Sequence, residues 1–274
     1  MAQAQLKQVE QAEAGAEERV RAADERWVRF KVDLWATDLN DVEIGIMKDT
    51  QLRAESRQFT KDMEVIGQIT EDGERSGIIG WREGLWRDEE GMKRRLVLKL
   101  FSEKMNWQAS LDLLLGRSLQ LTHAAGVATP AYAINIARHD QMVQLERSAM
   151  KLPLFTEKFS FFVLNDDGPA YYRLRRKRFA MSADYELYNQ RNQKVGDLDG
   201  QLVNLGGAWK VKLKASEANA QLEAVLKLFC AMLRFNAKAR GQVAKLYGDI
   251  ERGRADPKLD SQEDDFYMNP RRVR

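Results

Sequence analysis

The chain has 274 residues, of which 44% are hydrophobic and 31% are charged, a composition typical of a folded globular protein with a sizeable core. Lysine and arginine total 44 against 41 aspartate and glutamate residues, and the resulting net charge of +3 gives no sign of a nucleic-acid partner. One cysteine excludes an internal disulfide framework and a cysteine-rich zinc site, and two histidines argue against a histidine-rich metal site or a histidine-dependent relay.

The sequence shows neither a signal peptide nor a membrane-spanning helix. Residues 1–26 lack an apolar core, and the longest apolar stretch, residues 224–235, is interrupted by Lys227 and Arg234. That stretch is also shorter than the roughly 20 residues that a spanning helix needs. We therefore expect a cytoplasmic protein, for which contact with a membrane surface stays open.

The N-terminal segment has helical periodicity. Between Leu6 and Trp27, apolar or small residues recur at alternating spacings of three and four, which predicts a helix over residues 1–26. Most of these positions are Ala or Val, and one is Glu, where a stable coiled coil has Leu or Ile. The helix could lie on its own domain, or it could mediate self-association or docking to a partner.

Residues 27–105 form a β-rich region. Val28, Phe30, Val32 and Leu34 alternate with charged residues, and this period of two predicts a strand with one buried face. Further short apolar pieces follow, separated by Gly and Asp turns such as residues 71–74.

Residues 106–152 change to helical spacing. One helix is predicted after Asn106, a plausible N-cap, from the residues that share a face: Trp107, Leu111, Leu114, Leu115, Ser118 and Leu121. Thr129 and Pro130 resemble a cap followed by proline at the first helical position, which predicts a second helix to about residue 150.

Residues 153–252 combine strands with an apolar helix. The alternation of Phe159, Phe161 and Val163 predicts a strand, and the Asp-Gly pair in the turn at 165–169 predicts a hairpin. Further strands are predicted over 171–179, around Tyr185 and Leu187, over 195–199 and over 209–214. The helix that follows is apolar on nearly every side up to residue 235 and therefore requires burial. Residues 253–274 are expected to be a flexible charged tail.

These elements define an α+β fold. We expect an antiparallel β-barrel, or a strongly curved sheet, packed around the apolar C-terminal helix, with additional N-terminal and central helices.

Residues 159–235 resemble the tubby-like group, which includes the LURP-one-related proteins and the phospholipid scramblases. The resemblance is carried by FSFFVLNDDG (159–168), YELYNQRNQKVGDLDG (185–200), GGAWKVKL (206–213) and the apolar helix AVLKLFCAML (224–233). It implies a closed antiparallel barrel around a hydrophobic C-terminal helix, and basic contacts to lipid. Residues 155–214 supply about half of the strands of such a barrel. Either residues 27–101 complete it, or the chain is a half-size relative.

Two rows of basic residues are the candidate binding site. On a strand, Arg173, Arg175 and Lys177 share one face at a spacing of about 7 Å, which suits phosphates or anionic headgroups. Lys210, Lys212 and Lys214 form a second row, and the rows would merge into one patch if their strands were neighbours. The alternative is a solvated sheet face whose charge prevents aggregation.

Other chemistry has weaker support. Asp197 and Asp199 would share a strand face, but no histidine or third carboxylate accompanies them. Asp166 and Asp167 are explained as turn residues, and Cys230 is expected to be a buried, inert thiol. No glycine motif for phosphate binding is present. The sequence therefore assigns no catalytic residue, metal or cofactor.

The preferred hypothesis is a non-catalytic cytoplasmic adaptor or scaffold. Its six basic residues would bind an anionic lipid surface or an acidic protein, and the N-terminal helix would mediate homo-oligomerisation. Nucleic acid is not an expected partner. The alternatives are a structural subunit of a larger assembly and a hydrolase that uses Asp197 or Asp199.

Overall fold

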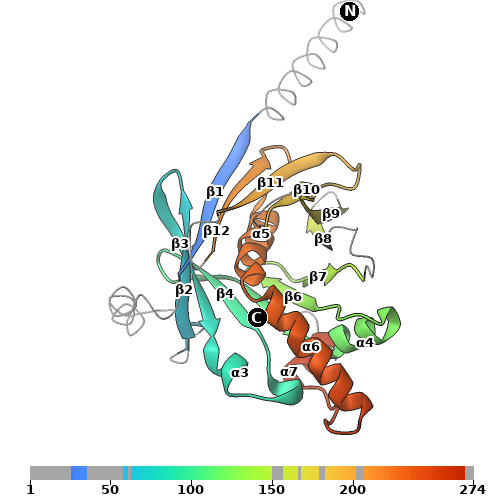
Figure 1. Ribbon diagram of the computed structural model, residues 1–274. Helices are drawn as coiled ribbons and strands as arrows, with labels where there is room; N and C mark the ends of the chain where they lie inside the picture. Colours follow the sequence, from blue (N-terminus) through green and yellow to red (C-terminus); the bar gives the residue numbers. More distant parts are fainter. Residues whose placement is uncertain are drawn as a thin grey trace, which may run out of the picture.

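Twelve antiparallel strands form a closed barrel, shown in Figure 1. The structure is a computed structural model that describes residues 26–35, 58–60, 63–149, 157–165, 168–178, 183–201 and 207–268. The first strand, β1 (Trp27–Leu34), closes the barrel by pairing with β12 (Ala208–Lys214) on one side and with β2 (Met63–Glu71) on the other. The two β-rich parts of the sequence therefore belong to one barrel.

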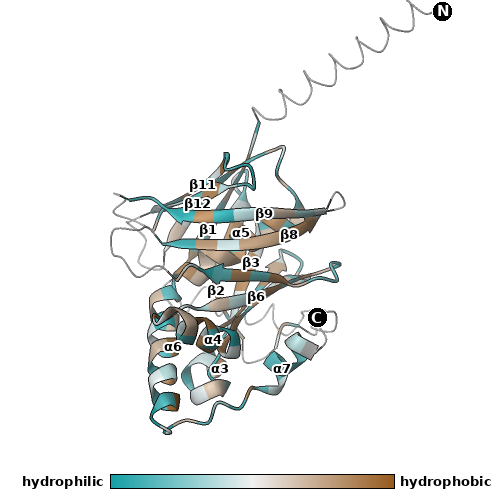
Figure 2. Ribbon diagram, turned by 90° about the vertical axis from the view of Figure 1, so that its right-hand side faces the viewer, coloured by the Kyte–Doolittle hydropathy of each residue, from teal (hydrophilic) through white to brown (hydrophobic). Residues whose placement is uncertain are grey.

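The other strands follow the chain around the barrel in order. They are β3 (Glu74–Arg82), β4 (Val97–Ser102), β5 (Trp107–Leu114), β6 (Ala131–Ile136), β7 (Val143–Arg147), β8 (Lys158–Asn165), β9 (Gly168–Arg176), β10 (Tyr185–Tyr188) and β11 (Lys194–Gln201). The described helices are α3 (Glu83–Arg87), the 3-10 helix η1 (Gly91–Lys93), α4 (Leu115–Ala125), α5 (Ala220–Leu233), α6 (Asn236–Glu251) and α7 (Ser261–Met268). Figure 2 shows α3, α4, α6 and α7 gathered at one end of the barrel.

The strands with alternating sequences lie where the pattern predicted them. In β1, Phe30, Val32 and Leu34 are buried, whereas the intervening residues are partly exposed. β8 and β9 form the hairpin that the Asp-Gly pair predicted, because Asn165 pairs with Gly168 in the register of these strands. A period of two identifies these strands because their outer faces meet solvent.

Helix α5 is almost entirely withdrawn from solvent. Asn219 caps it by accepting a hydrogen bond from the Leu222 N–H at 2.8 Å. Phe229 is fully buried, and its ring centroid lies 5.1 Å from those of Phe159 on β8 and Tyr185 on β10. The helix also contacts β1, β4, β5 and β6. Its burial removes the apolar side chains from water, which is the main stabilising contribution such a helix makes.

The prediction of two helices over residues 106–152 is wrong for most of that segment. Residues 107–114 form β5, residues 131–136 form β6 and residues 143–147 form β7, so that the helical part is α4. All six residues of β6 are buried. On the outer face, Leu114 and Ala133 pack against Phe266 of α7. A strand covered on both faces has no polar alternation, and its apolar spacing resembles that of a helix.

The expected flexible tail is also wrong over the described part of residues 253–274. Residues 261–268 form α7, in which Phe266 and Glu263 are buried. The same segment also contacts Arg95, which lies 3.5 Å from Asp260 Oδ1 and donates a hydrogen bond to Gln262 Oε1 at 2.8 Å. Glu263 accepts hydrogen bonds from the first turn of α4, and Phe266 packs on Leu114 and Ala133, so these contacts dock α7 on the barrel.

The predicted helix over residues 1–26 lies, except for its last residue, outside the described residues. Among the described helices, none combines the length and the apolar character needed to cross a bilayer.

Candidate functional site

The two predicted basic rows do not form one patch. Arg173 and Arg175 lie on β9, with Lys177 just beyond its end, whereas Lys210, Lys212 and Lys214 lie on β12. Strands β10 and β11 separate them, so the rows are three strands apart in a barrel of twelve. Three strands span a quarter of the circumference, and the two rows therefore face different directions.

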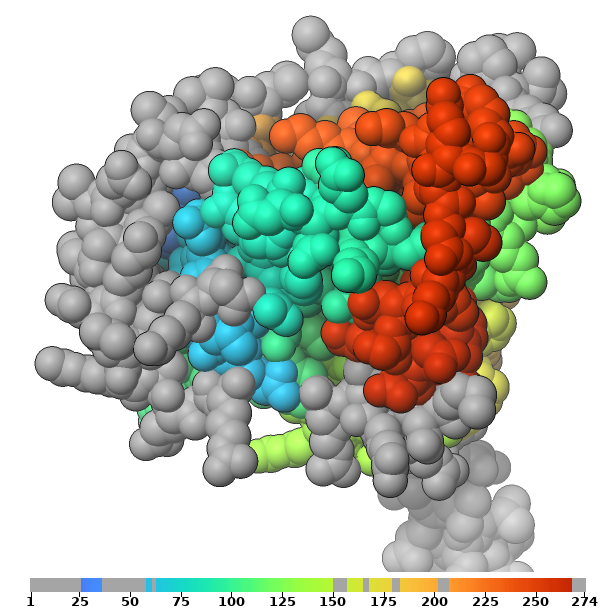
Figure 3. Space-filling model, turned by 90° about the horizontal axis from the view of Figure 1, so that it is seen from below, coloured from blue at the N-terminus to red at the C-terminus, as the bar shows by residue number. Residues whose placement is uncertain are grey.

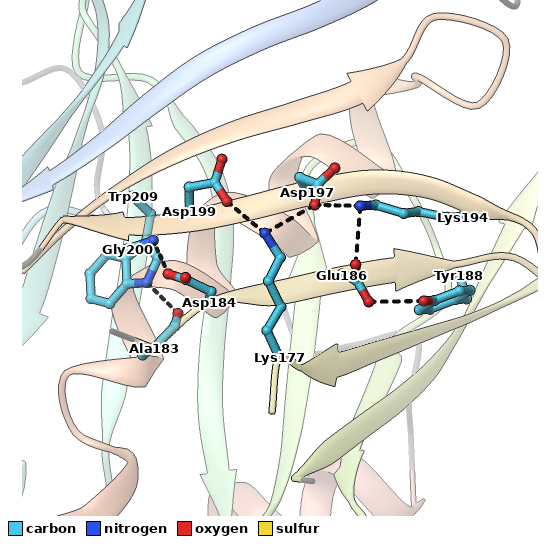
Figure 4. Close-up of polar contacts among 10 residues, drawn as sticks. All are labelled: Lys177, Ala183, Asp184, Glu186, Tyr188, Lys194, Asp197, Asp199, Gly200 and Trp209. Carbon is cyan, nitrogen blue, oxygen red and sulfur yellow. Dashed lines mark hydrogen bonds and ion pairs between the residues drawn. The ribbon is translucent and has the colours of Figure 1, made fainter. Parts of the chain in front are cut away.

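Acidic side chains occupy the surface between the rows. Glu186 lies on β10, and Asp197 and Asp199 lie on β11. The Lys177 ammonium is 2.8 Å from Asp199 Oδ1 and 3.3 Å from Asp197 Oδ1, as Figure 4 shows. Lys194 joins the same network, at 2.8 Å from Asp197 Oδ1 and 3.1 Å from Glu186 Oε1. The predicted ligand-binding residue Lys177 is therefore held in ion pairs across three strands.

Electrostatics keep Lys177 in its charged form. Partial burial alone would lower the pKa of Lys177, but hydrogen bonds to Asp199 and Asp197 outweigh it and the pKa is raised. The same balance, with Asp197 and Glu186 as acceptors, raises the pKa of Lys194. This network ties β9, β10 and β11 together, and its charges are already compensated.

The two arginines of the β9 row lie close to neighbouring side chains. Arg173 donates a hydrogen bond to Asn192 Oδ1 at 2.7 Å, and its guanidinium carbon lies 5.9 Å from the ring centroid of Tyr171. Arg175 is exposed and lies opposite Glu186 in the register of β9 and β10. An opposite charge directly across a pair of strands lowers the net positive potential of this row.

The β12 row continues onto β1 and becomes wider than the sequence suggested. Lys214 pairs with Trp27, Lys212 with Arg29 and Lys210 with Lys31. We call this surface the β12–β1 face; it consists of Trp27, Arg29, Lys31, Lys210, Lys212 and Lys214. The sequence analysis missed its three β1 residues, because the alternation that identifies β1 as a strand does not reveal which strand it pairs with.

Three basic residues of the β12–β1 face form no ion pair with the described residues. Asp33, two residues beyond Lys31 on β1, is an acidic neighbour of this face and pairs with Lys31 at 2.8 Å. Within the described part of the chain, Arg29, Lys210 and Lys212 are exposed and have no ion-pair partner within 4.0 Å. Asp197 and Asp199 lie opposite Lys212 and Lys210 across β11 and β12, but their closest lysines are Lys194 and Lys177.

The carboxylate pair does not have the setting of a catalytic dyad. Asp197 and Asp199 lie on the outer surface of the barrel, where their side chains are 20% and 45% exposed and bind Lys177. Neither residue lines any cavity described below. General acid–base catalysis needs a carboxyl group whose environment retunes its proton affinity within reach of a bound substrate, and this surface supplies no such enclosure.

The described ranges contain neither a cluster of potential metal ligands nor a reactive thiol. No group of three or more His, Cys, Asp or Glu side chains is placed there to hold a metal ion. Cys230 is fully buried in α5, and burial raises the pKa of its thiol. A thiol that stays protonated is a poor nucleophile.

Comparisons of the chain with protein-family models, curated proteins and solved structures gave no match. A closed antiparallel barrel is compatible with the tubby-like resemblance of residues 159–235.

Proposed function

We propose that this protein is a non-catalytic adaptor that binds anionic lipid membranes through the β12–β1 face. The observation that carries the proposal is the juxtaposition of Arg29, Lys210 and Lys212, exposed and without ion-pair partners in the described part of the chain. Each basic residue near an anionic bilayer contributes about 1 kcal/mol. Three such residues on two paired strands form a compact, fixed site.

The aromatic residue at the edge of this face favours a lipid surface over an acidic protein. Trp27 is 38% exposed and lies opposite Lys214 at the beginning of β1. Tryptophan is enriched at the interface between headgroups and acyl chains, because its ring is apolar and its indole N–H is polar. An exposed tryptophan beside lysines is therefore suited to peripheral membrane contact.

Helix α5 and the N-terminal residues have separate roles in this proposal. We propose that α5 fills the barrel as in the tubby-like group, so that the barrel is a rigid support for its outer faces. Residues 1–26 precede β1 directly and would mediate assembly of several copies. Several copies would multiply a weak membrane contact through avidity. The site of action would then be the cytoplasmic face of a membrane.

Vesicle sedimentation tests the proposal. We expect the protein to bind phosphatidylcholine vesicles only when they contain phosphatidylserine, and added salt should weaken the binding. The R29Q/K210Q/K212Q triple variant should bind about 100-fold more weakly, at about 1 kcal/mol for each lost charge. The R175Q/R176Q/R178Q variant removes the same number of exposed charges elsewhere and should retain most of the affinity. Equal losses in both variants would contradict the assignment of this face.

A second candidate function, a subunit of a protein assembly, is favoured by one exposed ring pair. Phe162 is 57% exposed and lies 4.9 Å from Tyr171, centroid to centroid, on the outer face of β8 and β9. Large exposed aromatic residues often mark protein interfaces. Light scattering of the wild type and F162S over a range of concentrations would reveal assembly through this pair.

A further inference from the structure

A cationic pocket lies at the end of the barrel where the helices gather. It is about 310 Å³ in volume and is lined by Trp81, Trp86, Arg87, Arg94, Arg234, Phe235 and Lys238. Trp81 comes from β3, Trp86 and Arg87 from α3, Phe235 from the junction of α5 and α6, and Lys238 from α6. In Figure 3, the teal surface around α3 adjoins the orange-red surface of these helices.

The base of this pocket is aromatic. The Phe235 ring centroid lies 5.1 Å from that of Trp81 and 6.3 Å from that of Trp86. Trp81, Trp86 and Phe235 are each at most 5% exposed. Three packed rings form a rigid apolar base that water cannot easily penetrate, and electrostatic interactions beside such a base are less screened than on an open surface.

Three arginines are held against these rings. The guanidinium carbon of Arg87 lies 5.5 Å from the Trp81 centroid, that of Arg94 lies 5.3 Å from Trp86, and that of Arg234 lies 5.8 Å from Phe235. Arg94 Nε also donates to the Trp86 carbonyl at 2.7 Å. Cation–π contacts and hydrogen bonds fix the side chains before any ligand binds, which lowers the entropic cost of binding.

The positive charge of the pocket exceeds the nearby negative charge. Its lining contains four cationic side chains and no acidic one. Arg87 is ion-paired with Glu83 of α3. Lys238 is exposed and has no ion-pair partner among the described residues. The two terminal nitrogens of Arg94 likewise have no hydrogen-bond partner among them.

One buried donor in the lining also lacks a partner. The indole N–H of Trp81 is inaccessible to solvent and has no hydrogen-bond partner among the described residues. The residue as a whole is 3% exposed. A buried N–H without an acceptor costs about 1–3 kcal/mol. A ligand oxygen that reached this N–H would supply the missing acceptor.

We propose that this pocket binds a phosphate monoester with a small apolar or aromatic group. A planar guanidinium group matches the geometry of a phosphate group and can donate two parallel hydrogen bonds to two of its oxygens. The volume is at the lower limit for small-molecule sites, so it suits a compact ligand. This site is separate from the β12–β1 face and does not depend on the proposed membrane function.

Calorimetry with phenyl phosphate tests the proposal on the full-length chain. We expect phenyl phosphate to bind more tightly than inorganic phosphate, because its ring contacts the aromatic base. K238Q and R87Q should each weaken binding about tenfold, which corresponds to one charge-assisted contact. R94K keeps the charge but loses the planar donor group, and it should weaken binding by a similar factor.

R240Q is the matched control, because Arg240 is exposed on the same helix as Lys238 but does not line the pocket. It should bind phenyl phosphate like the wild type. Thermal unfolding of each variant separates lost binding from lost folding. No binding of phenyl phosphate by the wild type, or an equal loss in R240Q and K238Q, would overturn the proposal.

A vesicle experiment identifies the source of the phosphate group. It uses the R29Q/K210Q/K212Q background, which removes the β12–β1 face, and phosphatidylcholine vesicles with and without phosphatidic acid. Binding to phosphatidic acid that phenyl phosphate displaces would support the pocket with a lipid headgroup as its ligand. Binding of phenyl phosphate without vesicle binding would support the pocket with a soluble phosphate ester.

Discussion

The carboxylate of Glu263 accepts a hydrogen bond from the Leu115 N–H at 2.8 Å, which joins residues 148 positions apart in the sequence. Its other oxygen accepts from the Arg117 N–H at 3.2 Å. Both donors belong to the first turn of α4, whose N-terminal N–H groups have no partner within the helix. A side chain of α7 therefore caps α4, and this contact fixes the C-terminal segment against the barrel.

Loss of this cap should destabilise the protein. We expect E263A to lower the free energy of unfolding by about 1–2 kcal/mol, the usual contribution of an N-cap. Urea denaturation would measure the change. The D264N variant alters the exposed neighbouring carboxylate and should unfold like the wild type. An E263A variant with unchanged stability would show that α7 docks without the cap.

A buried carboxyl group on the outer face of β5 should make stability depend on pH. Burial raises the pKa of Asp112 from 3.8 to about 6, although the nearby charges of Arg95 and Lys99 oppose the shift. The folded protein therefore binds a proton more tightly than the unfolded chain between these values. The contribution of Asp112 to stability is fully present below the unfolded pKa and is lost as the pH rises through the folded pKa.

We expect the stability of D112N to lack the pH-dependent contribution of Asp112. Wild-type stability should include a fall of up to about 3 kcal/mol between pH 4 and pH 7 from a shift of this size. Denaturation in urea at several pH values would measure the difference between the two proteins. D265N, at an exposed position of α7, is the control and should follow the wild-type curve. Parallel curves for D112N and the wild type would exclude Asp112 as the titrating group.

Truncation of the central aromatic residue of α5 should be severe. Phe229 is fully buried between Phe159 and Tyr185. Because the surrounding strands form a closed barrel, they cannot easily collapse into the space left by F229A. We expect a loss of about 3–5 kcal/mol, measured by chemical denaturation. L233A, at a partly exposed position of the same helix, should cost clearly less.

Substitution by alanine should have opposite effects on stability at two glycines. A Cβ atom on Gly67 of β2 would lie 2.5 Å from the Asp33 carbonyl oxygen of β1, whereas one on Gly241 of α6 would have no atom within 4 Å. G67A should therefore force β1 and β2 apart and lower the melting temperature. G241A should raise the stability by about 0.5–1 kcal/mol, because alanine restricts the unfolded chain and favours helix. An unchanged melting temperature of G67A would mean that β1 and β2 make room for the added methyl group without loss of stability.

Sequence reasoning found the parts of the fold that have one face in water. β1, β8, β9 and β12 could be predicted because apolar and polar residues alternate along them. It failed for β5 and β6, whose outer-face residues Leu114 and Ala133 are covered by Phe266 of α7. It also missed the short strand β7, although Gln144 on the outer face of that strand is exposed. The polar alternation that distinguishes a strand from a helix is absent when both faces are buried.

The sequence by itself determined which strands carry basic rows and which helix is too apolar to remain in water. Both properties are local, because they follow from the spacing of residues within one element. Only the tertiary structure decided that β1 closes the barrel against β12, which places Arg29 beside Lys210 and Lys212. It also placed acidic residues of β10 and β11 between the β9 row and the β12 row. The assembly of Trp81, Arg94 and Lys238 around one pocket was decided in the same way. Contacts between residues distant in the chain depend on strand order and closure, which local periodicity does not encode.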